Sequence, residues 1–302
     1  MIQFRGCYTA IVTPFTDDGT TVDESRLAEQ IGFQADGGVS GIVACGTTGE
    51  SPTLEADEHR LVVESAVRLG RARGMQVIAG AGSNSTHHAV ELQKLAHALG
   101  ADAGLQVSPY YNKPSQEGLY RHFMTVADSC PLPIMLYNIP GRCGVAINPD
   151  TVARLAKHPN IVAIKEATGS MDSASEIRQR CDLTILSGDD SLTLPFAACG
   201  SSGVVSVVSN LWPARVQSLC DAFLANDFAR AQEIHRELFP VAKGLLSLDV
   251  NPVPLKAAMK LLGRDSGSVR LPLAPASRET VDRIAEILAK SSLTRLESVV
   301  RA

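Results

Sequence analysis

Residues 133–165 read PIMLYNIPGRCGVAINPDTVARLAKHPNIVAIK and contain two short apolar runs on either side of a helical pattern. The runs, Pro133–Tyr137 and Ile161–Lys165, are nearly continuous in apolar residues, as strands covered on both faces are. Between them, the apolar residues of Pro149–Lys157 fall at positions i, i+3 and i+4, which indicates a helix with Asn148 as its N-cap. The stretch therefore predicts a strand–helix–strand unit.

The same alternation of apolar run and helical pattern recurs along the chain, at intervals of about 20–35 residues that suit a βα unit. The apolar runs are Cys7–Thr13, Gly41–Cys45, Gln76–Ala79, Gly104–Ser108, Pro133–Tyr137, Ile161–Lys165, Thr184–Ser187 and Gly203–Val207. The helical patterns between them are Asp23–Asp36, Glu55–Leu69, Thr86–Leu99, Gln116–Asp128, Pro149–Lys157, Ser173–Arg180 and Leu192–Cys199. We therefore predict an α/β fold, a (β/α)8 TIM barrel with additional C-terminal helices.

A doubly wound nucleotide-binding sheet is the alternative fold, and its glycine motifs are missing. The first strand ends in Val12–Phe15, which reads VTPF and cannot cradle a pyrophosphate. Gly80–Ser85 lacks the third glycine of the dinucleotide motif, and Gly46–Ser51 lacks the G-K-[ST] ending of a P-loop. Nucleotide binding is therefore excluded.

The chain has 302 residues, more than the roughly 250 of a plain barrel. After the eighth run the pattern is wholly helical: Pro213–Ala225, Phe228–Ser247, Pro254–Leu262 and Arg278–Lys290. The first of these can be the eighth barrel helix. We therefore predict a catalytic barrel over residues 1–225 and a helical extension packed on it over residues 226–302.

Composition excludes several classes of protein. The net charge is −4, the mean hydropathy is +0.06, and basic residues form no cluster, so nothing indicates a nucleic-acid partner. The apolar runs are too short to span a bilayer, and the N-terminus lacks a signal peptide pattern, so we expect a cytoplasmic protein. The seven cysteines form no C-x-x-C pair, and no other grouping of metal ligands stands out, so we expect no metal site.

Active sites of such barrels lie at the carboxyl ends of the strands, and one lysine stands there. Lys113 lies in a loop, and the other six lysines fall in helical patterns where we expect solvated surface charges: Lys94, Lys157, Lys243, Lys256, Lys260 and Lys290. Lys165 ends a buried strand, where burial favours the neutral amine that can attack a ketone and form a Schiff base. The alternative is a lysine that reaches solvent or pairs with Glu166.

Other strand ends supply groups that suit amine chemistry on anionic substrates. Tyr137 ends the preceding strand, within reach of Lys165, and its phenol can move protons. Thr47 and Thr48, between two glycines, can hold a carboxylate, and Arg142 can capture a second one. Each also has a structural interpretation: a buried tyrosine, a tight turn and a surface arginine. Adjacent carboxylates at a further strand end, Asp189 and Asp190, are interpreted as the cap of the next helix.

Six segments together resemble dihydrodipicolinate synthases, also called 4-hydroxy-tetrahydrodipicolinate synthases, within the pyruvate-dependent N-acetylneuraminate lyase superfamily. They occur in order over essentially the whole chain: Gly46–Ser51, Pro109–Pro114, Tyr137–Arg142, Ile164–Gly169, Gly188–Asp190 and Asn251–Lys256. The resemblance implies a lyase that condenses pyruvate with L-aspartate 4-semialdehyde in lysine and diaminopimelate biosynthesis. It also implies a homotetramer built as a dimer of dimers, with no cofactor beyond the covalent imine between Lys165 and pyruvate.

The resemblance also implies roles for individual residues. Lys165 forms the imine, and Tyr137, Thr48 and Tyr111 relay protons, Tyr111 being supplied by the neighbouring subunit. The residues implied to bind substrate are Thr47, Thr48, Arg142, Gly188 and the carbonyl of Val205.

The family's effector site for lysine maps to Ser51, His59, Asn84, Tyr110 and His88. Sensitive members carry an acid where this chain has His88, and a histidine where it has Ala56. Because an imidazole does not attract the ammonium of lysine as a carboxylate does, we expect feedback inhibition to be weak or absent.

Two other functions stay open at this point. One is another pyruvate-dependent aldolase that acts on a sugar acid, although Thr48 and Arg142 resemble the synthase branch more. The other is a catalytically inactive barrel with a binding or regulatory role. The joint presence of five residues argues against it: Lys165, Tyr137, Thr48, Tyr111 and Arg142.

Overall fold

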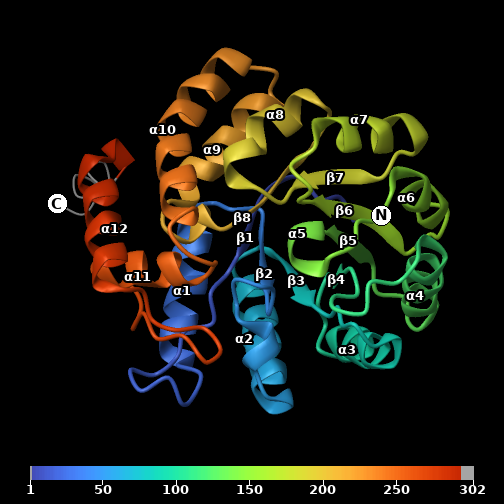
Figure 1. The fold of residues 1–302 in the computed structure, drawn as a ribbon, viewed down its shortest axis with the longest axis horizontal. Helices are drawn as coiled ribbons and strands as arrows, with labels where there is room; N and C mark the ends of the chain where they lie inside the picture. The colour runs from blue at the N-terminus through green and yellow to red at the C-terminus, as the bar shows by residue number, and fades with distance from the viewer. Residues whose placement is uncertain (1, 294–302) are drawn as a thin grey trace.

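A computed structural model describes residues 2–293, and its centre is a closed barrel of eight parallel strands. The strands pair in sequence order, and β8 pairs with β1 to close the barrel (Figure 1). Their bounds are β1 Gly6–Ala10, β2 Gly41–Ala44, β3 Gln76–Gly80, β4 Ala103–Val107, β5 Ile134–Asn138, β6 Ile161–Glu166, β7 Thr184–Ser187 and β8 Gly203–Ser206. The predicted TIM barrel is confirmed.

Helices surround the strands, as the apolar patterns predict (Figure 1). The α-helices are α1 Glu24–Asp36, α2 Ala56–Ala72, α3 Thr86–Ala98, α4 Gln116–Asp128, α5 Pro140–Cys143, α6 Pro149–Leu155, α7 Met171–Arg180, α8 Thr193–Ala198, α9 Pro213–Leu224, α10 Phe228–Leu246, α11 Val253–Leu261 and α12 Arg278–Lys290. The described residues also form three short 3-10 helices, which are η1 Ser51–Thr53, η2 Asp190–Leu192 and η3 Val208–Asn210. The sequence patterns miss α5 and all three 3-10 helices, which are too short to show a periodicity.

Two local predictions differ from the structure. The first strand ends at Ala10 rather than Thr13, because Val12 N–H donates to the Asn210 side chain (3.2 Å) and the Thr13 carbonyl accepts from a lysine, so neither group joins the β ladder. Asn148 occupies the N-cap position of α6, but its side chain makes no capping hydrogen bond. Its backbone N–H instead donates to Oε1 of Gln116 at 3.0 Å.

Apolar side chains fill the barrel interior and the layer between the strands and helices. Tyr8, Val43, Ile78, Met135 and Leu186 are among the interior residues, and each is almost fully buried. Because successive side chains of a strand point to opposite faces, alternate residues of every strand enter this interior. Because these side chains fill the interior, a substrate can be accommodated only at the rim of the barrel.

The C-terminal helices pack against the barrel and share its core. α10 contacts α9 and η2, and α11 and α12 contact α10 (Figure 1). Leu255, Met259 and Ile284 belong to the same buried cluster as Val62 of α2 and Val204 of β8. The boundary between residues 225 and 226 stays a prediction, and residues 294–302 of the predicted extension lie outside the described part of the chain.

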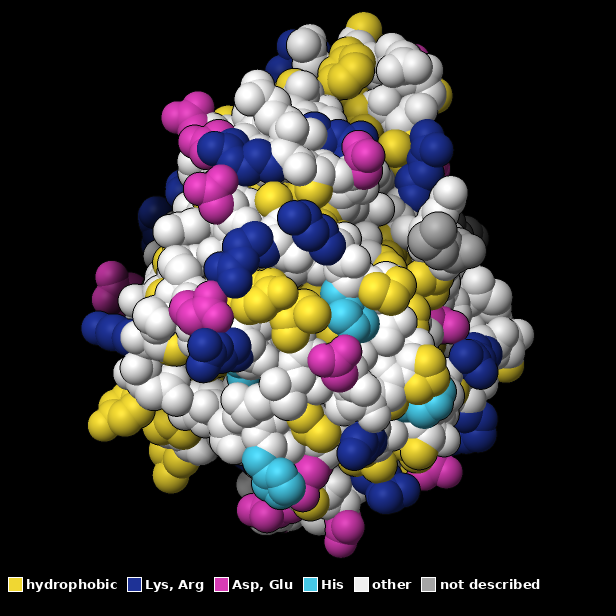
Figure 2. All heavy atoms as spheres, turned by 90° about the vertical axis from the view of Figure 1, so that its right-hand side faces the viewer, with side chains coloured by type: hydrophobic (Ala, Val, Ile, Leu, Met, Phe, Trp, Pro, Cys, Tyr) yellow, Lys and Arg dark blue, Asp and Glu magenta, His cyan; other side chains and the backbone are white. Residues whose placement is uncertain are grey.

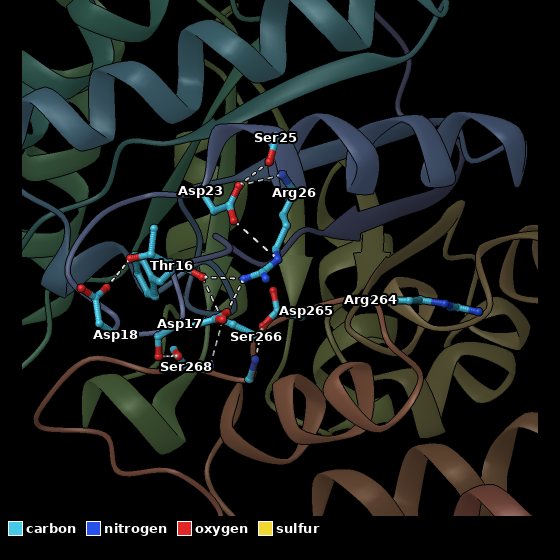
Figure 3. A network of polar contacts seen from close by, with 12 residues as sticks. Thr16, Asp17, Asp18, Asp23, Ser25, Arg26, Arg264, Asp265, Ser266 and Ser268 are labelled. Carbon is cyan, nitrogen blue, oxygen red and sulfur yellow. Dashed lines mark hydrogen bonds and ion pairs between the residues drawn. The ribbon is translucent and has the colours of Figure 1, made fainter.

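The loop after α11 fastens the C-terminal part to the N-terminal loop, as Figure 3 shows. Ser266 Oγ donates to the Phe15 carbonyl at 2.8 Å, and Ser268 Oγ donates to the Asp17 carbonyl at 3.0 Å. Arg26 of α1 forms an ion pair with Asp17 (3.0 Å) on the same loop. We call residues 264–270 the strap, because they join these two distant parts of the chain.

The outer face seen in Figure 2 mixes cationic and anionic side chains, with apolar side chains between them. Ion pairs on the helices include Arg154–Glu117 (2.9 Å) and Arg180–Asp150 (2.8 Å), and both are largely exposed. Such pairs contribute little to stability because water and salt screen them. Within residues 2–293, no helix combines the length and the apolar character needed to cross a membrane.

His122 of α4 generates a prediction about stability and pH. The side chain is buried beside Thr86 (2.9 Å from Nδ1 to Oγ1), and burial lowers the pKa of His122 from 6.5 to about 4. Between these pH values the unfolded state binds more protons, so His122 lowers the free energy of unfolding as the pH falls, by up to about 3 kcal/mol. We expect His122→Asn to unfold with a shallower pH dependence between pH 6.5 and 4, measured by urea titration.

Other buried groups also titrate in this range, so the quantity to compare is the difference between wild type and variant at each pH. A difference that stays constant from pH 7 to about pH 4 would contradict the prediction.

Candidate active site

A cavity of about 280 Å³ opens at the carboxyl ends of the strands and brings most of the predicted site residues together. From the barrel it is lined by Thr47, Thr48, Tyr137, Ile139, Arg142, Lys165, Gly188, Asp189, Asp190, Ser191 and Val207. From the C-terminal part it is lined by Ala242, Lys243, Leu246, Ser247 and Asn251. The barrel therefore forms only part of the wall, and the C-terminal helices complete it.

Lys165 lies on β6 with its amine in this cavity. Register pairs Lys165 with Tyr137 on β5, and Nζ lies 4.1 Å from the centroid of the Tyr137 ring. The lysine is only 6% exposed, so its side chain does not extend into solvent. Among residues 2–293 no carboxylate forms an ion pair with Nζ. The amine therefore faces the cavity without a carboxylate partner, where a carbonyl compound bound in the cavity can reach it.

Glu166, the alternative partner for Lys165, is engaged elsewhere. As the next residue on β6, it points to the opposite face of the strand. Its carboxylate accepts hydrogen bonds from Asn138 Nδ2 at 3.1 Å and from Thr168 N–H at 2.8 Å. Burial raises the pKa of Glu166, while the Thr168 and Asn138 bonds oppose that shift. Glu166 therefore ties β6 to β5 and leaves the amine of Lys165 without a counterion.

Thr47 and Thr48 lie in the turn that follows β2. Thr48 is 2% exposed, and its Oγ1 accepts a hydrogen bond from Nδ2 of Asn251 at 2.9 Å. Arg142 lies on α5, not in a loop, and its guanidinium is exposed at the cavity, where Nη2 is 3.4 Å from the Asn251 carbonyl. Asn251 therefore contacts two of the predicted substrate-binding residues.

Tyr111 and Val205 do not line the cavity of their own chain. Tyr111 is 89% exposed and has a left-handed backbone, with φ of 72°. Val205 is buried in the barrel interior on β8, and it is Val207, two residues later, that reaches the cavity wall. The distances from these two residues to a substrate stay predictions.

Asp189 and Asp190 have different hydrogen-bond partners, and only Asp189 caps the next helix as predicted. Asp189 caps η2, because its Oδ1 accepts from Ser191 N–H at 3.0 Å. The prediction is wrong for Asp190, whose carboxylate accepts from Ser206 Oγ and from the N–H groups of Val207 (2.8 Å) and Val208 (3.2 Å). Burial raises the pKa of Asp190. This carboxylate holds the end of β8, a contact that adjacent sequence positions cannot reveal.

Lys256 is also predicted wrongly, because it is not a surface charge. It lies on α11, fully buried, with Nζ 2.7 Å from Oε1 of Glu50 and 2.9 Å from the Thr13 carbonyl. Burial lowers the pKa of Lys256, and the Glu50 carboxylate opposes this shift. The sequence does carry a signal for this burial. Apart from Lys256, all residues of 253–259 are apolar, and a helix that is apolar on all its faces is buried.

The residues predicted for an effector site lie at the amino-terminal end of α2 and around α3. His59 is buried with Nε2 2.8 Å from the Gly80 carbonyl. Burial lowers the pKa of His59, the Gly80 hydrogen bond opposes this shift, and His88 adds to it. His88 is exposed on α3 beside Glu91 (3.4 Å). The Asn84 carbonyl accepts from Asn112. The remaining two are Ser51, half-buried in η1, and Tyr110, 39% exposed.

Over residues 2–293, no three His, Cys, Asp or Glu side chains come together in a geometry that holds a metal ion. The polar side chains of the cavity are two amines (Lys165 and Lys243), hydroxyls, a guanidinium, the amide of Asn251 and two carboxylates that are already hydrogen-bonded.

The family described as the dihydrodipicolinate synthetase family matches residues 3–291. The chain belongs to this family. It is 49% identical to the 4-hydroxy-tetrahydrodipicolinate synthase of Geotalea daltonii, over 96% of this chain and 100% of the relative. The chain therefore has 4-hydroxy-tetrahydrodipicolinate synthase activity and is a lyase of lysine and diaminopimelate biosynthesis.

Solved structures agree with this assignment. The dihydrodipicolinate synthase of Aquifex aeolicus superimposes with a TM-score of 0.92 at 47% identity, covering 96% of this chain and 99% of that one. The chloride-inhibited synthase of Acinetobacter baumannii, solved in complex with pyruvate, gives 0.93 at 38% identity, covering 96% and 100%.

Asn251 is a site residue that the sequence patterns did not single out, and its contact with Thr48 can be tested. Asn251→Ala removes the donor to Thr48 Oγ1 and leaves that hydroxyl free to rotate. A hydrogen bond of this kind contributes up to about 1.5 kcal/mol, so we expect kcat/KM for pyruvate to fall about 2- to 10-fold. Steady-state kinetics with a coupled assay measures this, and wild-type values would contradict it.

Proposed function

We propose that this enzyme condenses pyruvate with L-aspartate 4-semialdehyde through an imine on Nζ of Lys165. The observation that carries the proposal is the buried amine of Lys165, which faces the cavity beside Tyr137 and pairs with no carboxylate among the described residues. The pyruvate complex of the Acinetobacter baumannii relative supports the choice of the first substrate.

In the first stage, Lys165 Nζ attacks C2 of pyruvate, the carbonyl oxygen takes up protons, and water leaves to give the imine. Tyr137 is the group placed to carry these protons, since its ring lies beside the amine. Thr47 and Thr48 hold the pyruvate carboxylate with hydroxyl and backbone N–H groups, beside Gly188, where an added Cβ would lie 3.2 Å from Cε of Lys165.

In the second stage, loss of a proton from C3 gives an enamine, whose C3 attacks the aldehyde carbon and forms the new carbon–carbon bond. The amine of the semialdehyde then attacks C2 of the imine and displaces Lys165, which closes the ring and frees the enzyme. Arg142 is exposed at the cavity and binds the carboxylate of the second substrate as a bidentate partner.

We also propose a homotetramer built as a dimer of dimers, in the cytoplasm. Tyr111 supports the assembly: it is 89% exposed and lies outside its own cavity, so a second subunit is needed to cover it and to receive its hydroxyl in a proton relay. We further propose that the backbone carbonyl of Val205, on the strand that ends at the cavity, lies beside the bound pyruvate.

Borohydride trapping tests the imine directly. With pyruvate and sodium borohydride, we expect a single adduct on Lys165 and loss of activity, located by peptide mass spectrometry. Lys256 is an internal control, because it is the other buried lysine and does not line the cavity. Active protein that loses no activity and carries no adduct on Lys165 would refute the mechanism.

We propose that lysine inhibits this enzyme weakly or not at all, because His88 stands where sensitive members carry an acid. The imidazole already contacts Glu91 and offers no carboxylate of its own to an ammonium group. We expect millimolar lysine to leave initial rates close to the uninhibited value, while His88→Glu gains inhibition. Strong inhibition of the wild-type enzyme would contradict this proposal.

A further inference from the structure

Lys256 is a buried lysine that the proposed mechanism does not use. It does not line the cavity, and its Nζ contacts Oε1 of Glu50 at 2.7 Å, the Thr13 carbonyl at 2.9 Å and the Phe15 ring at 4.2 Å. The side chains of the pair are 0% and 1% exposed, so these contacts replace hydration completely. Burying two charges costs much of what their attraction contributes, so such a pair is weak evidence for stability alone.

The carboxylate of Glu50 joins the turn after β2 to two other segments, α11 and the strap. Oε1 binds Lys256 of α11, and Oε2 accepts the backbone N–H of Arg270 in the strap at 3.0 Å. Glu50 itself has φ of 54°, in the left-handed region that disfavours residues with a Cβ atom. Such a conformation persists only where surrounding contacts impose it, and the ion pair with Lys256 is one of those contacts.

The strap that receives the other oxygen is itself anchored. The Arg270 guanidinium donates to Oε1 of Glu58 at 2.6 Å and to the Thr20 carbonyl at 2.7 Å, and it lies 4.2 Å from the Phe15 ring. The strap's serines bind the N-terminal loop at the same time (Figure 3). Both oxygens of the Glu50 carboxylate therefore bind segments that are themselves anchored, Oε1 to α11 and Oε2 to the strap.

The ion pair lies close in sequence to a hydrogen bond at the cavity. Thr48 is two residues before Glu50, and Asn251 is five residues before Lys256. Because Asn251 Nδ2 donates to Thr48 Oγ1 at 2.9 Å, the same two segments are joined twice, once in the core and once at the cavity wall. Without the core contact, the two segments can shift against each other and displace the hydroxyl.

We propose that the Glu50–Lys256 ion pair positions the Thr48 hydroxyl for the reaction, through the turn after β2 and through Asn251. Lys256 and Glu50 are thus positioning residues that touch no substrate. This inference rests on the proposed function, because it takes Thr48 to contact pyruvate.

A double-mutant cycle between Lys256 and Thr48 tests this inference. We compare wild type, Lys256→Met, Thr48→Val and the double variant, measuring kcat and KM for pyruvate well below each thermal midpoint. A displaced catalytic group costs about 10- to 100-fold in rate, so we expect Lys256→Met to lower kcat/KM by that factor in the wild-type background. In the Thr48→Val background, where no hydroxyl remains to be positioned, we expect a loss of less than about twofold.

Equal losses in both backgrounds would overturn the inference and leave the pair a purely structural contact. If Lys256→Met does not fold, Glu50→Gln/Lys256→Met replaces it in the same cycle, since removing both charges leaves neither member of the pair as an unpaired buried ion. Lys260→Met is the matched control, one turn further along α11 and exposed, and should match wild type. Wild-type kcat/KM in Thr48→Val would instead refute the role proposed for Thr48, and this inference with it.

Discussion

Closure of the barrel is the constraint on which the rest of the structure depends. Because β8 pairs with β1, the carboxyl ends of all eight strands meet at one rim, although they are far apart in sequence. The parallel register of β5 and β6 then sets Tyr137 beside Lys165, and the alternation of side chains turns both into the interior. The chemistry of the site follows from this geometry, since a phenol and an amine become neighbours without any local sequence motif.

The two buried lysines lie in different environments, which is the basis for proposing different roles for them. Lys256 keeps a carboxylate, a carbonyl and an aromatic ring within contact distance, which stabilises its ammonium form. Lys165 has a ring beside it and open space in front, while Glu166 is occupied on the other face of the strand. Lys256 is therefore enclosed by its partners, whereas the amine of Lys165 faces a cavity that a carbonyl compound can enter.

Sequence patterns predicted the parts of this molecule that depend on local chain properties. The runs that form β2 to β8, the helices around them, and Lys165, Tyr137, Thr47 and Thr48 at strand ends all follow from periodicity and from strand direction. Contacts across the fold did not follow in the same way. Asn251 and Lys256 are about 200 residues from Thr48 and Glu50, and the contact of Asp190 with the end of β8 likewise requires the closed barrel. The partners of Asn251 and Lys256 can be named only once the C-terminal helices are placed against the rim, although the apolar neighbours of Lys256 in the sequence already indicate its burial.

The central claim is that pyruvate becomes covalently attached to Lys165 inside the cavity at the rim. A crystal structure of the enzyme soaked in pyruvate tests it most directly. The account predicts continuous electron density from Nζ of Lys165 to the C2 atom of a three-carbon acid, with its carboxylate at Thr47 and Thr48. Pyruvate bound in the cavity with no bond to Lys165, or attached to a different lysine, would contradict it.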